Sequence, residues 1–319
     1  MKGTGGIVCA VLGHDAQDGK FEVRDFCFAT PKEHVYKPLP DPERLLVLVS
    51  GLGLGEEKAP SFAAELFAEW VCGDIGDKKD QERSSNIARV VLAGNSLQES
   101  PQDCMLNRKF NNLESDTQQL LTRGMDNLDS FLMQLLASVD VDIMPGEFDP
   151  GNHMLPQQPI HRCLLPHAFK YPTMHSVSNP YQCEVAGRLL LGTSGQPIKD
   201  MDSLCRQNDR LRLLQSCLEW GHISPSSPDT LCLAHPKPPA SCFPCYTDDP
   251  FIMEQCPDIL FAGNQPKFQT KLITALGGQA VRLVCIPSFS QTQTCVVVNL
   301  HTLDCYPMVF GDTQLTTEQ

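Results

Sequence analysis

The sequence predicts an α/β fold in which strands and helices alternate along most of the chain. Three apolar runs have the length and composition of buried strands: Leu45–Val49, residues 89–93 and residues 139–144. Each run ends in a glycine-containing loop, and helical patterns lie between the runs. Strands separated by helices favour a sheet with parallel neighbours and right-handed crossovers.

The N-terminal residues 1–40 follow a different pattern. Residues 7–12 and 21–28 indicate two strands joined by a turn that contains Asp18 and Gly19, which predicts a β-hairpin. A two-stranded hairpin is marginally stable alone, so we expect it to belong to a larger unit. Residues 30–42 are rich in proline and predict an extended linker.

Helices are predicted from capping residues and periodicity. Ser61 is a good N-cap for an amphipathic helix that includes Phe67 and Trp70 and ends at Gly73. Leucine and methionine residues spaced by three or four positions predict a longer helix over residues 115–137, and residues 208–220 predict another. The acidic stretch of residues 73–82 is predicted to be a solvated loop.

The remaining segments are predicted from proline content and from short apolar runs. Residues 146–166 contain too many prolines for regular structure, and residues 224–250 are predicted to be a long loop. Four closely spaced runs near the C-terminus predict an antiparallel sheet that completes the core: residues 259–262, 281–286 and 294–300, and Cys305–Val309.

Composition limits the possible functions. A formal net charge of −13 argues against broad electrostatic capture of DNA or RNA, so DNA contact is expected to be weak or indirect. No apolar stretch approaches the ~20 residues that span a membrane, and residues 1–6 lack the apolar core of a signal peptide. The 15 cysteines are therefore expected to be mostly buried and reduced, in the cytosol or nucleus.

The loops after the predicted strands lack the ligands of a hydrolytic metal centre. Sites in open α/β sheets form beyond the carboxyl ends of the strands, and a two-metal phosphoesterase needs a cluster of Asp, His and Asn there. This chain instead has Gly, Leu and Phe at most of these places. The positions that we interpret as a degenerate metal site are Gly51, Gly53, Asn95, Glu147, Phe148, Asp149, Asn264 and Pro266.

Several uncommon strings resemble those of the DNA polymerase delta small (B) subunit family. In one-letter code they are LVSGLGLG from Leu48, MPGEFDP from Met144, LPQQP from Leu155, NPYQ from Asn179, GTSGQ from Gly192, HISP from His222, PDTL from Pro228 and QTQT from Gln291. The resemblance extends in register from about Gly5 to Pro307. It implies two facing β-sheets flanked by helices, as in metallophosphoesterases, and an N-terminal hairpin that is a remnant of an OB fold.

The same resemblance implies that the metal chemistry has been lost. Where active relatives have Asp-x-His this chain has Gly51-Leu52-Gly53, and their Gly-Asp is Gly94-Asn95 here. Their Gly-Asn-His-Asp becomes residues 146–149, of which Asp149 keeps its type, and their Gly-His-x-His becomes residues 263–266. Two divalent ions need several anionic or imidazole ligands, so we expect no catalysis and no cofactor.

The resemblance further implies a scaffold in the nucleus. Such subunits bind the cysteine-rich C-terminal domain of the polymerase catalytic subunit and recruit a further accessory subunit. We expect residues 1–40 to form a partial OB-fold hairpin and linker, and residues 41–319 to form an inactive calcineurin-like phosphoesterase domain. An OB fold has five strands, so the hairpin alone cannot close one.

Two other functions stay open on the sequence alone. One is an active metallophosphoesterase with an atypical metal site. The other is a zinc-stabilised adaptor, because Cys242 and Cys245 form a CxxC motif that Cys232 and Cys256 could complete. A single CxxC with loose partners is weak evidence for zinc, and we favour an extended surface loop with incidental thiols.

Overall fold

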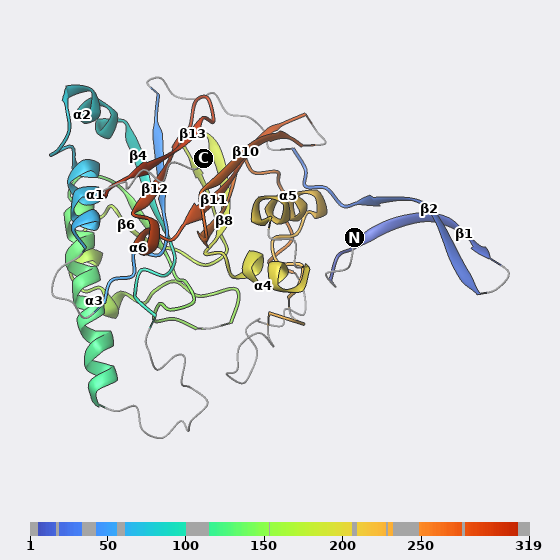
Figure 1. The fold of residues 1–319 in the computed structure, drawn as a ribbon, viewed down its shortest axis with the longest axis horizontal. Helices are drawn as coiled ribbons and strands as arrows, with labels where there is room; N and C mark the ends of the chain where they lie inside the picture. Colours follow the sequence, from blue (N-terminus) through green and yellow to red (C-terminus); the bar gives the residue numbers. More distant parts are fainter. Residues whose placement is uncertain are drawn as a thin grey trace, which may run out of the picture.

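Two β-sheets face each other in the body of the protein, with helices on both outer faces (Figure 1). A computed structural model describes residues 6–16, 19–33, 43–55, 61–99, 115–152, 154–205, 209–227, 229–231, 249–275 and 278–311, with side chains of the long helix described from residue 121. This arrangement confirms the predicted α/β class with sheets flanked by helices.

The first sheet has six strands in the order β13-β12-β3-β4-β5-β6. Strands β3 to β6 are mutually parallel, as the alternation of strands and helices predicts, whereas β12 is antiparallel to both β3 and β13. The bounds are β3 Leu45–Val49, β4 Ile87–Ala93, β5 Val141–Met144, β6 Met174–Ser176, β12 Thr294–Asn299 and β13 Cys305–Val309.

The second sheet has five strands in the order β10-β11-β9-β8-β7, and its central three strands are parallel. The bounds are β7 Tyr181–Val185, β8 Arg188–Thr193, β9 Ile259–Gln265, β10 Gln269–Thr274 and β11 Ala280–Pro287. The expectation of one antiparallel sheet for the C-terminal strands is therefore wrong. Strands β9 and β11 pair in parallel here, while β12 and β13 extend the first sheet.

Three apolar clusters form the layers of the core. One fills the space between the sheets, where Leu48, Val91, Phe261 and Val284 are fully buried. A second lies between the first sheet and helices α1 and α3, and a third lies between the second sheet and helices α4 and α5. These helices are α1 Phe62–Cys72, α3 Ser115–Leu136, α4 Gln196–Cys205 and α5 Arg210–Trp220.

The caps of the helices explain one success and one failure of the sequence predictions. Helix α1 begins at Ser61, whose side chain accepts a bond from the Ala64 amide, and ends at Gly73 in the left-handed conformation. The stretch predicted to be a solvated loop instead contains helix α2, Lys78–Ser85. A reciprocal capping box between Asp77 and Asp80 stabilises α2, which has almost no apolar face.

A buried charged cluster joins the two sheets at one edge. Arg89 on β4 lies 3.1 Å from the carboxylate of Asp142 on β5, and the Tyr181 hydroxyl on β7 donates to the same carboxylate at 2.7 Å. Because Asp142 is fully buried, these two donors offset the cost of removing its charge from water. The cluster fixes how β7 of the second sheet lies over β4 and β5.

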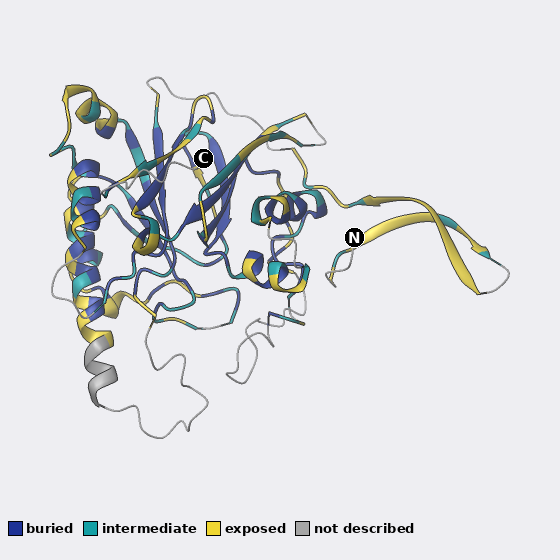
Figure 2. Ribbon diagram, viewed as in Figure 1, coloured by how far each residue is buried: buried dark blue, intermediate teal, exposed yellow. Residues whose placement is uncertain are grey.

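The N-terminal hairpin projects from this body (Figures 1 and 2). Strands β1 Cys9–Ala16 and β2 Lys20–Phe28 pair antiparallel, which confirms the predicted hairpin. Nearly all of its residues are exposed, but Phe28 at its base packs edge-on against Trp220 of α5. The chain is then tied to the body, because Lys32 pairs through its backbone with Glu254 and Cys256.

Short elements complete the described part of the fold. Two 3-10 helices, Arg162–Leu164 and Ala168–Lys170, lie between β5 and β6, so the prediction that residues 146–166 lack regular structure is wrong for one turn. A short helix α6, Phe289–Thr292, leads from β11 into β12. Within the described ranges no helix combines the length and the apolar composition needed to cross a bilayer. Most of the proline-rich linker, residues 34–42, lies outside the described part of the chain.

Candidate functional site: a crevice at the strand ends

The loops after β3, β4 and β5 and the carboxyl end of β9 meet at one end of the two sheets, as the positions of these parallel strands predict. The Gly51 amide donates to the Gly94 carbonyl at 2.9 Å, and the Asn264 amide donates to the Ser50 hydroxyl at 2.8 Å. Most of the predicted positions therefore lie together at this end of the sheets, and we refer to this group of loops as the crevice. Pro266 is an exception, because it follows the end of β9 and is exposed.

The glycine positions of the crevice cannot present ligands. Gly51 has φ +64°, and a Cβ atom there would lie 2.4 Å from the Ser288 hydroxyl and 2.8 Å from Oδ1 of Asn264. Gly53 also has φ +64°, and its Cβ would lie 2.9 Å from Cβ of Ser290. A side chain at either position would be strained and would also collide with its neighbours.

The amide side chains of the crevice bind protein backbone. Asn95 accepts a bond from the Phe148 amide at 3.3 Å, while Asn264 donates to the carbonyls of Ser194 at 2.8 Å and Ala93 at 3.3 Å. Oδ1 of Asn264 is buried without a hydrogen-bond partner among the described atoms. One neutral acceptor of this kind does not replace the anionic ligands of a divalent metal pair.

Asp149, the position that keeps its residue type, is a structural carboxylate. One of its oxygens accepts the Leu97 amide at 2.9 Å and the other accepts the Gly146 amide at 2.8 Å. Only 3% of the residue is exposed, and this burial raises the pKa of the carboxyl group above its usual value despite the backbone donors. Asp149 thereby joins the loop after β4 to the loop after β5.

Glu147 lies nearer the surface and also forms an ion pair. Its carboxylate pairs with the ammonium of Lys199 on α4 at 3.0 Å. Because the Lys199 side chain is 63% exposed, this ion pair is solvated and contributes little to stability. The pair links the loop after β5 to the helix that covers the second sheet.

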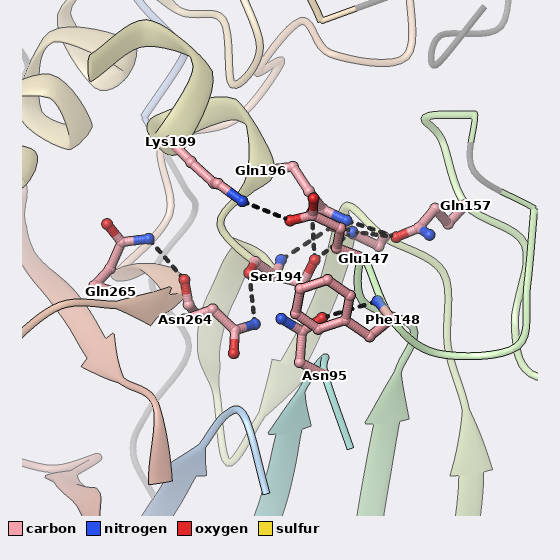
Figure 3. Close-up of polar contacts among 11 residues, drawn as sticks. Asn95, Glu147, Phe148, Gln157, Ser194, Gln196, Lys199, Asn264 and Gln265 are labelled. Atoms are coloured by element: carbon pink, nitrogen blue, oxygen red, sulfur yellow. Dashed lines mark hydrogen bonds and ion pairs between the residues drawn. The ribbon is translucent and has the colours of Figure 1, made fainter. Parts of the chain in front are cut away.

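A network of neutral side chains fills the centre of the crevice (Figure 3). The Asn179 side chain donates to Gln157 at 2.8 Å, to the Ser194 hydroxyl at 2.8 Å and to Gln196 at 3.0 Å. Gln157 in turn donates to the Gly146 carbonyl at 3.0 Å, and Ser194 bonds with Gln196. The network joins the loop after β5, the turn before β7 and the turn after β8 without any net charge.

The sequence prediction did not assign roles to these four residues, although a signal for them was present. Three of the uncommon strings supply them: LPQQP contains Gln157, NPYQ begins with Asn179, and GTSGQ contains Ser194 and Gln196. Polar residues in irregular loops have no periodicity that would reveal their partners. Among the described residues, no three His, Cys, Asp or Glu side chains lie close enough together to hold a metal ion.

The zinc candidates can be placed only in part. Cys232, Cys242 and Cys245 lie outside the described residues. Cys256 is 2% exposed, and burial raises the pKa of its thiol to about 11, so the thiol is protonated at neutral pH. Zinc is bound by thiolate, which this environment disfavours in the absence of metal.

The other cysteines vary in exposure. Of the 11 that are described, all free thiols, only Cys217, Cys256, Cys285 and Cys295 are buried, while Cys9, Cys27 and Cys163 are exposed. The expectation that most would be buried is therefore wrong for the described residues. Burial raises the pKa of Cys285 to about 12, which keeps it unreactive.

Comparisons with known proteins agree on one family. The family profile for the B subunit of DNA polymerases alpha and epsilon matches residues 46–270. A rice protein named "DNA polymerase delta small subunit" is 39% identical, over 96% of this chain and 68% of its own length. A Drosophila melanogaster protein named "DNA polymerase delta subunit 2" is 37% identical over the same shares of the two chains. An Arabidopsis thaliana protein named "DNA polymerase delta small subunit" is 38% identical, over 96% of this chain and 67% of its own length.

Proposed function

Since the chain belongs to the B-subunit family of DNA polymerases alpha and epsilon, we propose that it is a non-catalytic accessory subunit of a delta-type replicative DNA polymerase. The similarity to a delta small subunit covers 96% of this chain. This subunit would act in DNA replication and repair synthesis by holding other subunits together.

One observation supports the absence of catalysis: at the strand ends the carboxylates already bind protein groups, and the glycine positions have no room for ligand side chains. Two-metal hydrolysis needs anionic or imidazole ligands that converge on open coordination positions. The two carboxylates among the predicted positions are engaged, Asp149 with two backbone amides and Glu147 with Lys199. Gly51 and Gly53 have no room for a ligand side chain.

We propose an evolutionary interpretation of this architecture. Residues 41–319 are a phosphoesterase-like body whose chemistry has been replaced by structural bonds, and residues 1–40 are the hairpin of an OB fold with its linker. Two facing sheets flanked by helices fit the first part. The antiparallel, largely exposed pairing of β1 and β2 fits the second, because such a ribbon normally packs within a larger barrel.

The proposed partners are the cysteine-rich C-terminal domain of the polymerase catalytic subunit and a further accessory subunit, and the proposed location is the nucleus. A formal net charge of −13 fits contact with proteins better than direct grip on DNA. In a rigid fold without a catalytic site, binding partners usually contact the surface loops.

Within this proposal, the proline-rich segment of residues 146–166 is one contact surface. Its buried residues Leu155, Ile160 and Leu165 anchor it to the body, and the intervening Arg162 and Leu164 are exposed. An anchored loop loses little conformational entropy when it docks, which favours binding.

Two double variants test this surface. Arg162→Ala with Leu164→Ala should weaken binding to the catalytic subunit about tenfold while leaving the unfolding transition unchanged. The matched control is Leu121→Ala with Arg123→Ala, an exposed leucine and arginine with the same spacing on α3. Equal affinity of both variants and the wild type would place the interface elsewhere.

The absence of catalysis has its own test. The purified chain should not cleave bis(p-nitrophenyl) phosphate when Mn²⁺ is added, and it should retain no stoichiometric divalent metal after gel filtration. Turnover that depends on Mn²⁺ would contradict a silent crevice and would support the atypical metallophosphoesterase.

A further inference from the structure

An apolar pocket lies where the hairpin meets the body. It has a volume of about 530 Å³ and is bounded by the end of β2, the segment that follows it, helix α5 and the end of β10. Figure 2 shows the exposed hairpin reaching the body beside helix α5, and the pocket lies between them. The apolar residues that line it include Phe26, Phe28, Leu218, Cys256, Ile273 and Ala275.

The pocket combines a rigid floor with an exposed aromatic wall. Leu218 and Cys256 belong to the core beneath the second sheet and are 4% and 2% exposed. Phe28 packs against Trp220 with ring centroids 6.4 Å apart, and Phe26 packs edge-on against Phe28 at 5.4 Å. Phe26 is nevertheless 55% exposed, so the wall presents a large apolar surface to solvent.

The apolar surface continues from the pocket along one face of the hairpin. Val11 lies directly opposite Phe26 in the β1–β2 pairing, so both side chains are on the same face. Val11 is 50% exposed. An extended chain lying along this face would therefore meet apolar contacts before it reaches the pocket.

The charges beside the pocket favour a cationic partner over an anionic one. The carboxylates that line it belong to Glu33, which is exposed, and Glu219, which is half-buried and bonded to Gln215 and Arg212. No lysine or arginine is among the described lining residues, and the nearby Lys271 donates to Gln215. Phosphate groups would be repelled here, and a second copy of this chain would bring a like charge of −13.

We propose that this pocket receives a large apolar side chain, flanked by lysine or arginine, from an extended segment of another subunit of the polymerase. The assignment of the partner as a polymerase subunit rests on the proposed function, whereas the chemistry of the segment rests on the pocket itself. Anchoring of one aromatic or aliphatic side chain in a desolvated pocket is how peptide segments gain most of their binding energy.

The test uses the full chain and a fluorescein-labelled peptide with a central Phe flanked on each side by two Lys residues. Fluorescence anisotropy should show saturable binding, and replacing the central Phe by Ala should weaken it about tenfold, which corresponds to about 1.4 kcal/mol. Replacing the flanking Lys by Glu should also weaken binding, and added salt should reduce that difference.

Two variants of the protein locate the binding site. Phe26→Ala removes the aromatic wall, and Ala275→Trp fills the pocket, so each should weaken peptide binding about tenfold. The matched controls are Leu12→Ala, on the opposite face of the hairpin and 67% exposed, and Leu272→Trp, on β10 and 47% exposed. Neither control residue lines the pocket, and both variants should bind as the wild type does. Because Phe26 is half-exposed, its variant should keep the fold even if Ala275→Trp does not.

The outcomes separate this proposal from the proposed function. If Phe26→Ala binds the peptide as tightly as the wild type does, the pocket proposal is wrong. It is also wrong if the chain self-associates and Phe26→Ala abolishes that self-association. Binding of the catalytic subunit is measured in parallel, and its failure with intact peptide binding would overturn the proposed function alone.

Discussion

Replacing Asp149 by Ala should destabilise the protein without removing any activity. A surviving metal ligand would have the opposite property, because its removal abolishes metal binding and usually leaves the fold intact. In this structure both Asp149 oxygens instead accept backbone amides, from Leu97 at 2.9 Å and Gly146 at 2.8 Å. The substitution therefore leaves two buried donors without acceptors.

The size of the effect follows from these two bonds. A buried donor left unsatisfied costs about 1–3 kcal/mol, so two cost about 4 kcal/mol in the free energy of unfolding. For a protein of this size this lowers the thermal midpoint by about 10 °C. Asp149→Asn keeps one acceptor and should lose about half as much.

Denaturant unfolding followed by tryptophan fluorescence measures this loss. Trp70 on α1 and Trp220 on α5 are 4% and 8% exposed, so they report on the helical layers of both sheets. The control is Asp126→Ala, which removes an exposed carboxylate of helix α3. If Asp149→Ala unfolds at the same denaturant concentration as Asp126→Ala, Asp149 does not hold the two loops together.

Three other predictions follow from the crevice and the thiols. Gly51→Asp should lower the free energy of unfolding by about 2 kcal/mol or more, because φ of Gly51 is +64° and Ser288 occupies the space of a side chain. The substitution should not restore phosphodiesterase activity, and a variant as stable as the wild type would contradict the prediction. Burial raises the pKa of Asp149, so its contribution to stability is complete below the ordinary Asp pKa and is lost as the pH rises through the raised pKa. The wild type should therefore lose stability relative to Asp149→Asn as the pH rises above the ordinary Asp pKa, and parallel pH profiles of the two proteins would refute this. Iodoacetamide at about pH 8 should label the exposed Cys27 in the native protein but not the buried Cys285, because burial raises the pKa of the Cys285 thiol to about 12. Mass spectrometry that finds both cysteines labelled equally would contradict the burial of Cys285.

The sequence predicts the parallel part of the fold well because it depends on local patterns. The run Leu45–Val49 is apolar at every position and is buried at every position, as expected for a strand covered on both faces. Ser61 and Gly73 bound α1 through caps that act within a few residues. Convergence of the crevice loops follows from the general rule for the carboxyl ends of parallel strands.

Features that depend on distant pairing or on polar contacts were not predicted. Strand β10 lies between β9 and β11 in sequence but at the edge of the sheet in space, so short spacing does not imply a meander. Helix α2 depends on the capping box at Asp77 and not on an apolar stripe. The partners of Asn179 come from loops that are distant in sequence, and no pattern within those loops specifies their contacts.

The most direct test is the binding of this chain to the polymerase delta catalytic subunit, measured by analytical ultracentrifugation of the two purified proteins. The proposed scaffold function predicts a stable equimolar complex, which should also form with Gly51→Asp because the crevice needs no chemistry to support assembly. A folded chain that forms no complex with the catalytic subunit, and that instead hydrolyses a phosphodiester when Mn²⁺ is present, would contradict the account.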